Sequence, residues 1–480
     1  MSGFDVVILG GGPAGERAAI QAAKLGKKAA LVERENVVGG TGVNWGAIPS
    51  KTLRESALFV RNLTAHKLHG IECSIAANIT IPEFMHRERV VVARELELIN
   101  RSLDRWAVEI IRGHGHFLDP HTIGVRGVGG QTRLQLNADH VVIAVGSHPN
   151  RPADIDFDGE VAFDSGSILR LPRMPRSVVV LGAGVIGVEY AAIFAALGLQ
   201  VTLVDTRPEL LPYLDREVAS ILEHELKRLG IVIIHDDTYE KVLRLPGAPP
   251  AVRIHTRAKN TLEADVLLYC VGRTGNTADL GLERIGVTPN DRGLIPVNAD
   301  FQTSAPHVYA VGDVVGYPAL ASTSMEQGRL AVRHAFGAER TRRAALPLPV
   351  AIYAIPEVSY IGATEQELEA QGEDIVIGRG NYGMNPRGQI LGDTGGLLKL
   401  IFAAADLRLL GAHMVGAQAS EIIHIGQAFL YGRATAHEIM DTLYNYPTLS
   451  DLYRHAALDA LAVHRQRSRA PAPAPDLEST

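Results

Sequence analysis

Two glycine-rich motifs of the same spacing supply residues suited to binding a dinucleotide. Each reads G-x-G-x-x-G, and in both copies an acid follows the first glycine by 23 residues. The first glycine permits a tight turn, the second lets a pyrophosphate approach the backbone, and the third lets a helix pack closely on a strand. The helix N-terminus attracts the phosphate, and the acid accepts ribose hydroxyl hydrogens. The residues are Gly10, Gly12, Gly15 and Glu33 in the first copy, and Gly182, Gly184, Gly187 and Asp205 in the second.

The second copy leaves the nucleotide preference open. Asp205 favours a free 2′-hydroxyl and therefore NAD(H), whereas Arg207, two residues on, could face the 2′-phosphate of NADP(H). A protein that uses both nucleotides would need such a mixed site.

The elements that must position these motifs repeat as well. A buried strand at Phe4–Leu9, a helix at Ala18–Leu25 and a strand at Ala29–Val32 are followed later by the same succession from Ser177 to Val204. That later stretch is nearly all apolar, but three glycines and Glu189 argue against a membrane span. The pattern predicts an α/β protein with two Rossmann-like domains.

The rest of the chain divides at proline-bearing and less periodic segments. Helices are predicted at Thr52–Asn62, Pro82–Arg105 and Ala319–Ala335, and a strand at Ala264–Val271. After residue 348 the glycine-rich patterning stops, which indicates an α+β domain. The predicted ranges are 1–150 and 276–345 for one dinucleotide-binding domain in two segments, 151–275 for the other, 346–464 for the C-terminal domain and 465–480 for a disordered Pro/Ala-rich tail.

Composition excludes several functional classes. The net charge of −6 gives no electrostatic case for nucleic acid or an anionic membrane surface. Cys73 and Cys270 match no metal or redox spacing, so we expect two reduced thiols, no metal site and a cytoplasmic protein. A first strand that begins near residue 4 leaves no length for a signal peptide ahead of it.

Several further segments carry a family resemblance. The stretch Val37–Leu53 (VVGGTGVNWGAIPSKTL) is similar to the frame G-G-T-C-L-N-x-G-C-I-P-S-K of the flavoprotein disulfide reductases, and Thr303–Asp313 and Gly272–Asn276 resemble two other segments of these proteins. The motifs follow the order found in the two-dinucleotide-fold flavoproteins that include glutathione reductase and lipoamide dehydrogenase. The resemblance implies an FAD domain, an NAD(P) domain, a C-terminal dimerisation domain and a homodimer or larger homo-oligomer.

The sequence departs from this family at residues that disulfide reduction needs. Gly42 and Ala47 stand where the family has its two reactive cysteines, and Tyr446 stands where it has a histidine in H-P-T-x-x-E, with Asp451 at the acid position. Without thiolates there is no nucleophile for a disulfide, and no thiol that needs a base. An intact flavin frame without its thiols indicates a flavoprotein with a different electron acceptor.

Within the family, Leu267–Thr277, Gly312–Ser322, Ser420–Ala428 and Asn445–Thr448 resemble the soluble pyridine nucleotide transhydrogenases, which transfer hydride between NADPH and NAD+ through FAD. By resemblance, Lys51 lies near flavin N5, Glu189 pairs with Lys51 and contacts the nicotinamide, and Tyr446 reaches the flavin of the partner subunit. The remaining cofactor-binding residues that the motifs imply are Gly40, Thr41, Gly42, Gly146, Gly272 and Asp313.

Two other functions fit the same sequence. An NAD(P)H:quinone or dye reductase would pass electrons to a small acceptor that is not a nucleotide. A non-enzymatic sensor or subunit would bind FAD and NAD with negligible turnover.

Overall fold

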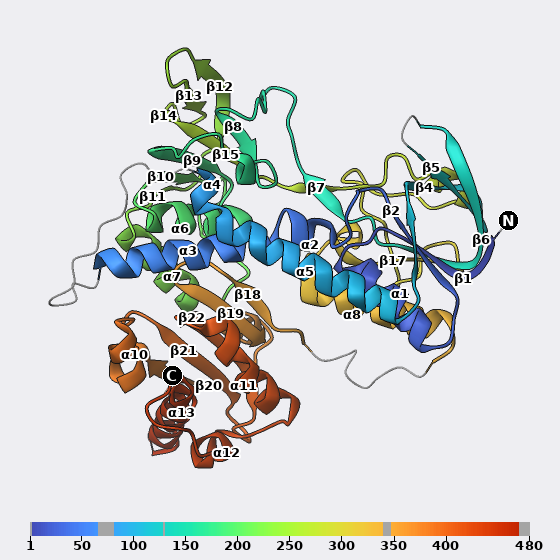
Figure 1. Cartoon of the computed structure of the whole chain (residues 1–480). Helices are drawn as coiled ribbons and strands as arrows, with labels where there is room; N and C mark the ends of the chain where they lie inside the picture. Colours follow the sequence, from blue (N-terminus) through green and yellow to red (C-terminus); the bar gives the residue numbers. More distant parts are fainter. Residues whose placement is uncertain (1, 66–80, 128–129, 339–346, 470–480) are drawn as a thin grey trace, which may run out of the picture. The chain divides into compact units, whose positions relative to one another are not determined.

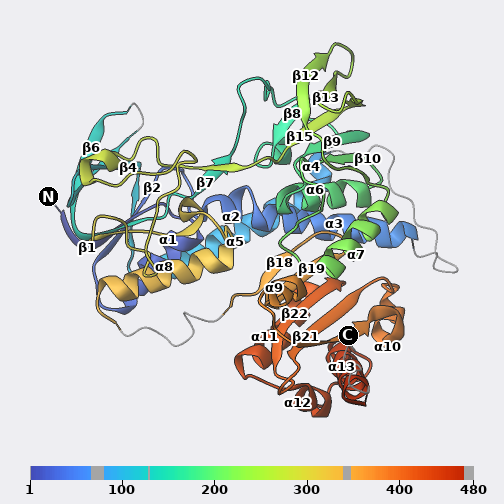
Figure 2. The same ribbon diagram turned by 180° about the vertical axis from the view of Figure 1, so that it is seen from behind.

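The computed structural model describes residues 2–65, 81–127, 130–338 and 347–469. The chain forms two compact units, Met1–Thr206 with Ile233–Ala345, and Arg207–Val232 with Leu346–Thr480. Most elements of each are labelled in Figure 1, and Figure 2 shows the chain from behind.

The first unit contains a mixed sheet in the order β3-β2-β1-β6-β5-β4, with β17 paired to β6. β1, β2, β3, β17 and the end of β6 run parallel, while β4 and β5 extend the sheet antiparallel. The strands are β1 (Ser2–Leu9), β2 (Ala29–Glu33), β3 (Glu109–Arg112), β4 (His114–Asp119), β5 (Thr122–Arg126), β6 (Thr132–Ile143) and β17 (Val308–Ala310).

Alternating residues of β1 are buried on both faces of this sheet, as expected for a central parallel strand. Helices α1, α5 and α8 lie side by side over one face (Figure 1). A Cβ on Gly328 of α8 would lie 2.2 Å from the Ala14 carbonyl oxygen, so glycine permits close packing of α8 on α1. The helices here are α1 (Pro13–Lys24), α2 (Gly40–Asn44), α3 (Ala47–Ala65), α4 (Ile81–Phe84), α5 (His86–Arg105) and α8 (Ala321–Ala335).

The second sheet of this unit has the order β11-β10-β9-β15-β8, and α6 (Val185–Ala196) follows β9 as α1 follows β1. A meander of β12, β13 and β14 and a two-stranded ribbon of β7 and β16 complete the unit. The strands are β7 (Ser147–Pro149), β8 (Ala162–Asp164), β9 (Ser177–Leu181), β10 (Gln200–Val204), β11 (Val232–Ile234), β12 (Tyr239–Leu245), β13 (Ala251–Thr256), β14 (Thr261–Ala264), β15 (Val266–Tyr269) and β16 (Arg273–Gly275).

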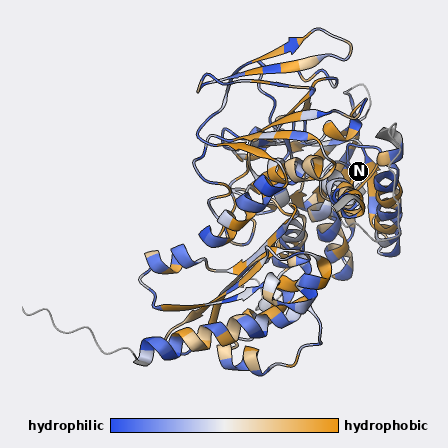
Figure 3. Cartoon of the chain, turned by 90° about the vertical axis from the view of Figure 1, so that its left-hand side faces the viewer, coloured by the Kyte–Doolittle hydropathy of each residue, from blue (hydrophilic) through white to orange (hydrophobic). Residues whose placement is uncertain are grey.

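The second unit is built on an antiparallel sheet in the order β18-β19-β22-β21-β20. Its helices carry both hydrophilic and hydrophobic residues (Figure 3), and its core holds buried residues of the sheet, α11, α12 and α13. The elements are α7 (Arg216–Arg228), β18 (Val350–Ile352), β19 (Glu357–Gly362), α9 (Glu365–Ala370), β20 (Ile375–Asn381), α10 (Pro386–Leu391), β21 (Leu397–Ala403), β22 (Leu409–Gly416), α11 (Ala419–Tyr431), α12 (Ala436–Asp441) and α13 (Leu452–Arg469).

Both predicted Rossmann-like repeats are present, and three sequence-based details need correction. The helix predicted at Pro82–Arg105 is interrupted at Met85, between α4 and α5. The strand predicted at Ala264–Val271 is shorter, because β14 and β15 belong to different sheets. Helix α13 continues through residues 465–469, which were predicted to be disordered; residues 470–480 lie outside the described part of the chain. In the described residues, no helix has the length and apolar character needed to cross a bilayer.

Three histidines of the first sheet make the stability of this unit pH-dependent. The Nδ1 atoms of His114, His116 and His140 are buried and have no hydrogen-bond partner among the described residues. Burial lowers the pKa of all three, and the charge of Arg126 lowers the pKa of His114 and His116 further. Below the ordinary value of 6.5 the unfolded chain therefore binds more protons than the fold at these sites, so they remove stability as the pH falls.

We expect His116→Gln to reduce this loss. Between pH 7.5 and 5.5, the melting temperature of the variant should fall by about 2–4 °C less than that of the wild type, measured by circular dichroism. Comparing the two proteins cancels the opposing contribution of Glu16 and Glu88, whose pKa values burial raises. Equal decreases in both proteins would contradict the assignment to His116.

Candidate functional site

The first glycine motif forms the turn between β1 and α1. Gly10 has φ +104°, and a Cβ on Gly15 would lie 1.9 Å from the Gly10 carbonyl oxygen, so neither position accepts a side chain without a shift. The Gly11 N–H donates a 2.7 Å hydrogen bond to Oε2 of Glu33 at the end of β2. Oε1 of Glu33 accepts a 2.9 Å bond from the Glu35 N–H. Each carboxylate oxygen keeps a second lone pair for a ribose hydroxyl.

The second motif repeats this construction between β9 and α6. Gly182 has φ +97°, and a Cβ on Gly187 would again lie 1.9 Å from the carbonyl oxygen of the first glycine. The Ala183 N–H donates to Oδ2 of Asp205, which directly follows β10. A Cβ on Gly184 would meet no atom within 4 Å, so the turn leaves open space beside α6. The two turns are therefore built alike down to the acid that holds them.

Two further segments meet the first turn at the N-terminus of α1. The Gly39 N–H donates to the Gly11 carbonyl oxygen over 2.7 Å, and a Cβ on Gly40 would lie 2.7 Å from Gly12 Cα. From the other end of the chain, a Cβ on Gly312 would lie 3.1 Å from the Ala14 Cβ. The fold thus brings two segments to the first dinucleotide turn. One is the frame around Thr41 and Gly42, and the other is the segment before Asp313.

The two positions that carry thiols in the disulfide reductases lie on α2 and at the start of α3. Gly42 is in α2, and Ala47 is the first residue of α3. Within the described ranges the chain has one cysteine, Cys270, and burial raises the pKa of its thiol far above its ordinary value. Cys73 lies outside these ranges. The described residues therefore offer no thiolate at this site.

Lys51 and Glu189 form an ion pair between α3 and α6. The Lys51 Nζ lies 2.7 Å from Glu189 Oε2, although the residues are 138 positions apart in the chain. The Glu189 side chain is 6% exposed and that of Lys51 29% exposed, so the carboxylate is shielded while part of the Lys51 side chain is open to solvent. The pair that the family resemblance implied is present; the roles of the two residues remain predictions.

Arg273 and Ser147 connect Asp313 to the ribbon of β7 and β16. Its Nε donates to Ser147 Oγ over 2.8 Å and its Nη2 to the Ser147 carbonyl oxygen, also over 2.8 Å. Ser147 Oγ in turn donates a 3.0 Å bond to Oδ2 of Asp313. Gly146 and Gly272, with φ +68° and +80°, turn the chain into the two strands of the ribbon. Sequence reasoning named Asp313 as a candidate but did not predict its contacts with Ser147 and Arg273, because only long-range folding brings these residues together.

The C-terminal candidates lie in the second unit. Tyr446 is 77% exposed. Asp451 pairs within its own segment, with His455 Nε2 at 3.3 Å and Arg454 Nε at 3.6 Å. The acid position therefore orients a histidine one helical turn later. Arg207 is partly exposed and also belongs to this unit.

The first turn fits an FAD molecule by its shape and its donors and acceptors. A Cβ on Gly12 would meet a single atom within 4 Å, Gly40 Cα at 3.7 Å, so the turn leaves the start of α1 open. The N-terminus of α1 presents backbone N–H groups to a phosphate, and Glu33 has lone pairs for a ribose. Among the described residues, Oδ1 of Asp313 accepts no hydrogen bond, so it can receive one from a ribityl hydroxyl.

Comparison with known families agrees with this geometry. The Pyridine nucleotide-disulphide oxidoreductase model matches residues 4–328, and the model of that family's dimerisation domain matches residues 348–457. The chain belongs to the pyridine nucleotide-disulphide oxidoreductase family. The two-domain dinucleotide fold with a C-terminal domain that the sequence predicted is the fold of this family.

Individual members of the family resemble nearly the whole chain. It is 42% identical to a soluble pyridine nucleotide transhydrogenase of Mycobacterium tuberculosis over 461 residues, which cover 96% of this chain and 98% of the relative. A soluble pyridine nucleotide transhydrogenase of Yersinia enterocolitica is 40% identical, with 95% and 98% covered.

Solved structures of the same family superimpose well on the chain. LpdA from Mycobacterium tuberculosis has a TM-score of 0.86 at 28% identity, with 95% of this chain and 99% of LpdA covered. The HOCl-induced flavoprotein disulfide reductase RclA from Escherichia coli has a TM-score of 0.82 at 27% identity, with the same coverage.

Proposed function

We propose that the protein is an FAD-dependent transhydrogenase that moves hydride between NADPH and NAD+ without a redox-active disulfide. The observation that carries this proposal is the 2.7 Å pair of Lys51 and Glu189, which is retained on a frame with Gly42 and Ala47 at both thiol positions. The ion pair expected beside the flavin is thus present, whereas the two cysteines expected beside it are replaced. Relatives that are 39–42% identical carry the transhydrogenase name, which supports the same activity.

The first turn would hold FAD, and the second would hold the nicotinamide dinucleotide. Glu33 and Asp205 would accept ribose hydroxyls, Asp313 would bind the ribityl chain, and Arg207 would face the 2′-phosphate of NADP(H). The remaining residues proposed to hold FAD are Gly10, Gly12, Gly15, Gly40, Thr41, Gly42 and Gly146; those proposed for the nucleotide are Gly182, Gly184, Gly187 and Gly272.

Bound FAD supplies the hydride chemistry, since its ring can accept hydride from one nicotinamide and return it to the next. Lys51 provides a positive charge that stabilises the charge developing during hydride transfer. Glu189, shielded in α6, fixes the direction of the Lys51 ammonium and lines the place for the nicotinamide. With glycine and alanine at the two thiol positions, no residue has to act as a base toward sulfur there, which is consistent with tyrosine at position 446.

We also propose a cytoplasmic homodimer that associates through the C-terminal domain. The match of residues 348–457 to a dimerisation domain supports this assembly. The 77% exposed Tyr446 side chain would be covered by the second subunit and would reach its flavin.

We expect the FAD-loaded protein to transfer hydride from NADPH to thio-NAD+ at a rate comparable to or above its rate of menadione reduction. The measurement follows the absorbance of reduced thio-nicotinamide, with menadione as the acceptor in a parallel assay. Rapid menadione reduction without transfer to thio-NAD+ would indicate a quinone reductase instead. Turnover with neither acceptor would indicate a nucleotide-binding protein without catalysis.

A further inference from the structure

A short chain of hydrogen bonds in the first unit supports the Asp313 carboxylate. Arg273 Nε donates to Ser147 Oγ over 2.8 Å, and Ser147 Oγ donates to Asp313 Oδ2 over 3.0 Å. Because a guanidinium N–H can only donate, the single hydroxyl proton of Ser147 is directed to the carboxylate. Oδ2 is thus occupied from within the protein, while Oδ1 accepts no hydrogen bond among the described residues. The chain of bonds decides which carboxylate oxygen is left for a ligand.

The ribbon of β7 and β16 keeps Ser147 and Arg273 together. Ser147 pairs with Gly275 in the antiparallel register, and its carbonyl oxygen accepts a 2.8 Å bond from Arg273 Nη2. The Ser147 residue is 5% exposed, so little water can compete for its hydroxyl. The chain passes through this ribbon each time it runs between the two larger sheets of the unit, since β7 lies between β6 and β8 and β16 between β15 and β17. Ser147 is therefore fixed by backbone pairing as well as by Arg273.

The Arg273 charge is balanced by the same carboxylate. Arg273 Nε lies 3.8 Å from Asp313 Oδ2, and the two side chains are 22% and 25% exposed. Burial lowers the pKa of Arg273, whereas the negative charges of Asp313 and Asp164 raise it. Loss of Arg273 would remove the cation beside Asp313 and the donor that directs the Ser147 hydroxyl.

We propose that Ser147 and Arg273 are positioning residues that turn Oδ1 of Asp313 toward the ribityl chain of FAD. They act through Asp313 and not by contact with the flavin ring. A carboxylate that is already oriented binds its ligand without losing side-chain freedom, so the two residues slow the release of FAD. This inference rests on the role of Asp313 in the proposed function, but it requires neither nucleotide binding nor hydride transfer.

The rate of FAD release from the loaded protein tests this inference, measured as free FAD in the ultrafiltrate at successive times after dilution. Ser147→Ala removes the hydroxyl and should speed release about 10-fold, the effect of losing one hydrogen bond to a charged group. Arg273→Met removes the donor behind that hydroxyl and should speed release by a similar factor. Ser147→Ala keeps the test available if Arg273→Met does not fold.

Double variants separate positioning from a general loss of structure. Asp313→Ala should itself speed release about 10-fold or more. In this background neither Ser147→Ala nor Arg273→Met should add more than about twofold, because no carboxylate is left to orient. In a Glu33→Gln background both should keep their full effect, because Glu33 would bind the adenosine end of FAD. A structural defect would instead add to both backgrounds alike.

His148 supplies the control within the ribbon. Its Nδ1 lies 2.7 Å from Asn276 Oδ1, so the ring joins β7 to the residue that follows β16. Successive side chains of a strand point to opposite faces, so His148 points away from the side of Ser147. His148→Ala should therefore loosen the ribbon and change the FAD release rate by less than about twofold.

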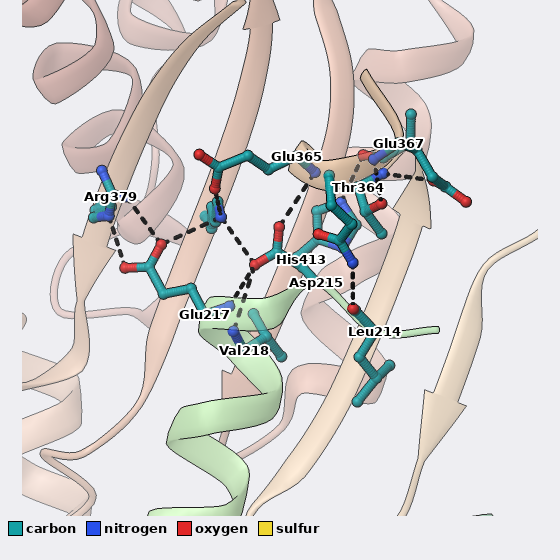
Figure 4. A network of polar contacts seen from close by, with 12 residues as sticks. Leu214, Asp215, Glu217, Val218, Thr364, Glu365, Glu367, Arg379 and His413 are labelled. Carbon is teal, nitrogen blue, oxygen red and sulfur yellow. Dashed lines mark hydrogen bonds and ion pairs between the residues drawn. The ribbon is translucent and has the colours of Figure 1, made fainter. Parts of the chain in front are cut away.

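A buried charge cluster of the second unit supplies the control for lost stability (Figure 4). Lys399, in β21, is completely buried, and its Nζ contacts carboxylates of Asp215, Glu217 and Glu365. Arg379 binds Glu217 through two hydrogen bonds of 2.7 and 3.0 Å. Arg379→Met removes these bonds and should lower the melting temperature. All of these residues belong to the second unit, so FAD release should stay within about twofold of the wild-type rate.

The outcomes distinguish this inference from the proposed function. Wild-type release rates in Ser147→Ala and Arg273→Met, with faster release in Asp313→Ala, would overturn the inference and leave Asp313 in the FAD site. Additive effects in the Asp313→Ala background, or equally fast release in His148→Ala or Arg379→Met, would also overturn it. Unchanged release in Asp313→Ala would instead remove Asp313 from the FAD site of the proposed function, and the inference with it.

Discussion

Replacing Lys51 by methionine is expected to slow flavin reduction by NADPH about 100-fold, the effect typical of removing one preorganised electrostatic contact to a transition state. Methionine keeps most of the length of the side chain and removes its charge. The measurement is anaerobic stopped-flow absorbance of the FAD-loaded protein, with FAD content determined beforehand. The flavin spectrum and FAD stoichiometry should remain those of the wild type, because the proposed FAD site is formed mainly by the turn after β1.

The substitution also removes the ammonium partner of a shielded carboxylate, so its effect on stability has to be separated from its effect on rate. The double variant Lys51→Met/Glu189→Gln removes both charges and should recover most of any stability lost in Lys51→Met while remaining slow. Lys227→Met is the control: it breaks a 2.7 Å pair with Glu223 on the surface of α7 and should leave the rate unchanged. A Lys51→Met enzyme within threefold of the wild-type rate would show that Lys51 has no electrostatic role in the reaction.

The parts of the fold that were predictable from sequence are those fixed by local backbone geometry. A strand, a turn with a left-handed glycine and a helix N-terminus place their residues at constant spacing, so Gly10–Gly15 and Gly182–Gly187 indicated both dinucleotide folds. The same 1.9 Å approach of the third glycine to the first explains why each copy needs glycine there. The contact of Lys51 with Glu189 follows from no local pattern and came from family resemblance alone.

The parts that were missed depend on contacts between distant segments. Lys399 interrupts an apolar strand, LLKLIFA, and a charge in such a strand signals a buried partner. That partner could not be named from sequence, because two of the three acids around it lie before residue 220 and the third at Glu365. Likewise, no local pattern indicates that the β7–β16 ribbon brings Ser147 and Arg273 to Asp313.

Gly184→Ala is expected to raise the KM for both NADPH and NAD+ by about 10- to 100-fold without lowering the melting temperature. Gly184 has φ −72°, which alanine adopts without strain, and its Cβ would meet no protein atom within 4 Å. The added methyl group therefore costs the fold little. It would stand at the N-terminus of α6, where the pyrophosphate of a bound dinucleotide needs to approach the backbone.

Comparison with Gly187→Ala separates an effect on nucleotide binding from an effect on stability. A Cβ on Gly187 would lie 1.9 Å from the Gly182 carbonyl oxygen, so this variant should lose stability as well as nucleotide affinity. Gly3→Ala, at another glycine with no atom within 4 Å of its Cβ, serves as the neutral control. FAD should remain bound in Gly184→Ala, because the flavin-side turn is a separate copy of the motif. Unchanged KM values in a stable Gly184→Ala protein would mean that the turn after β9 does not bind the nucleotide, and the second motif would then serve only to pack α6 on its sheet.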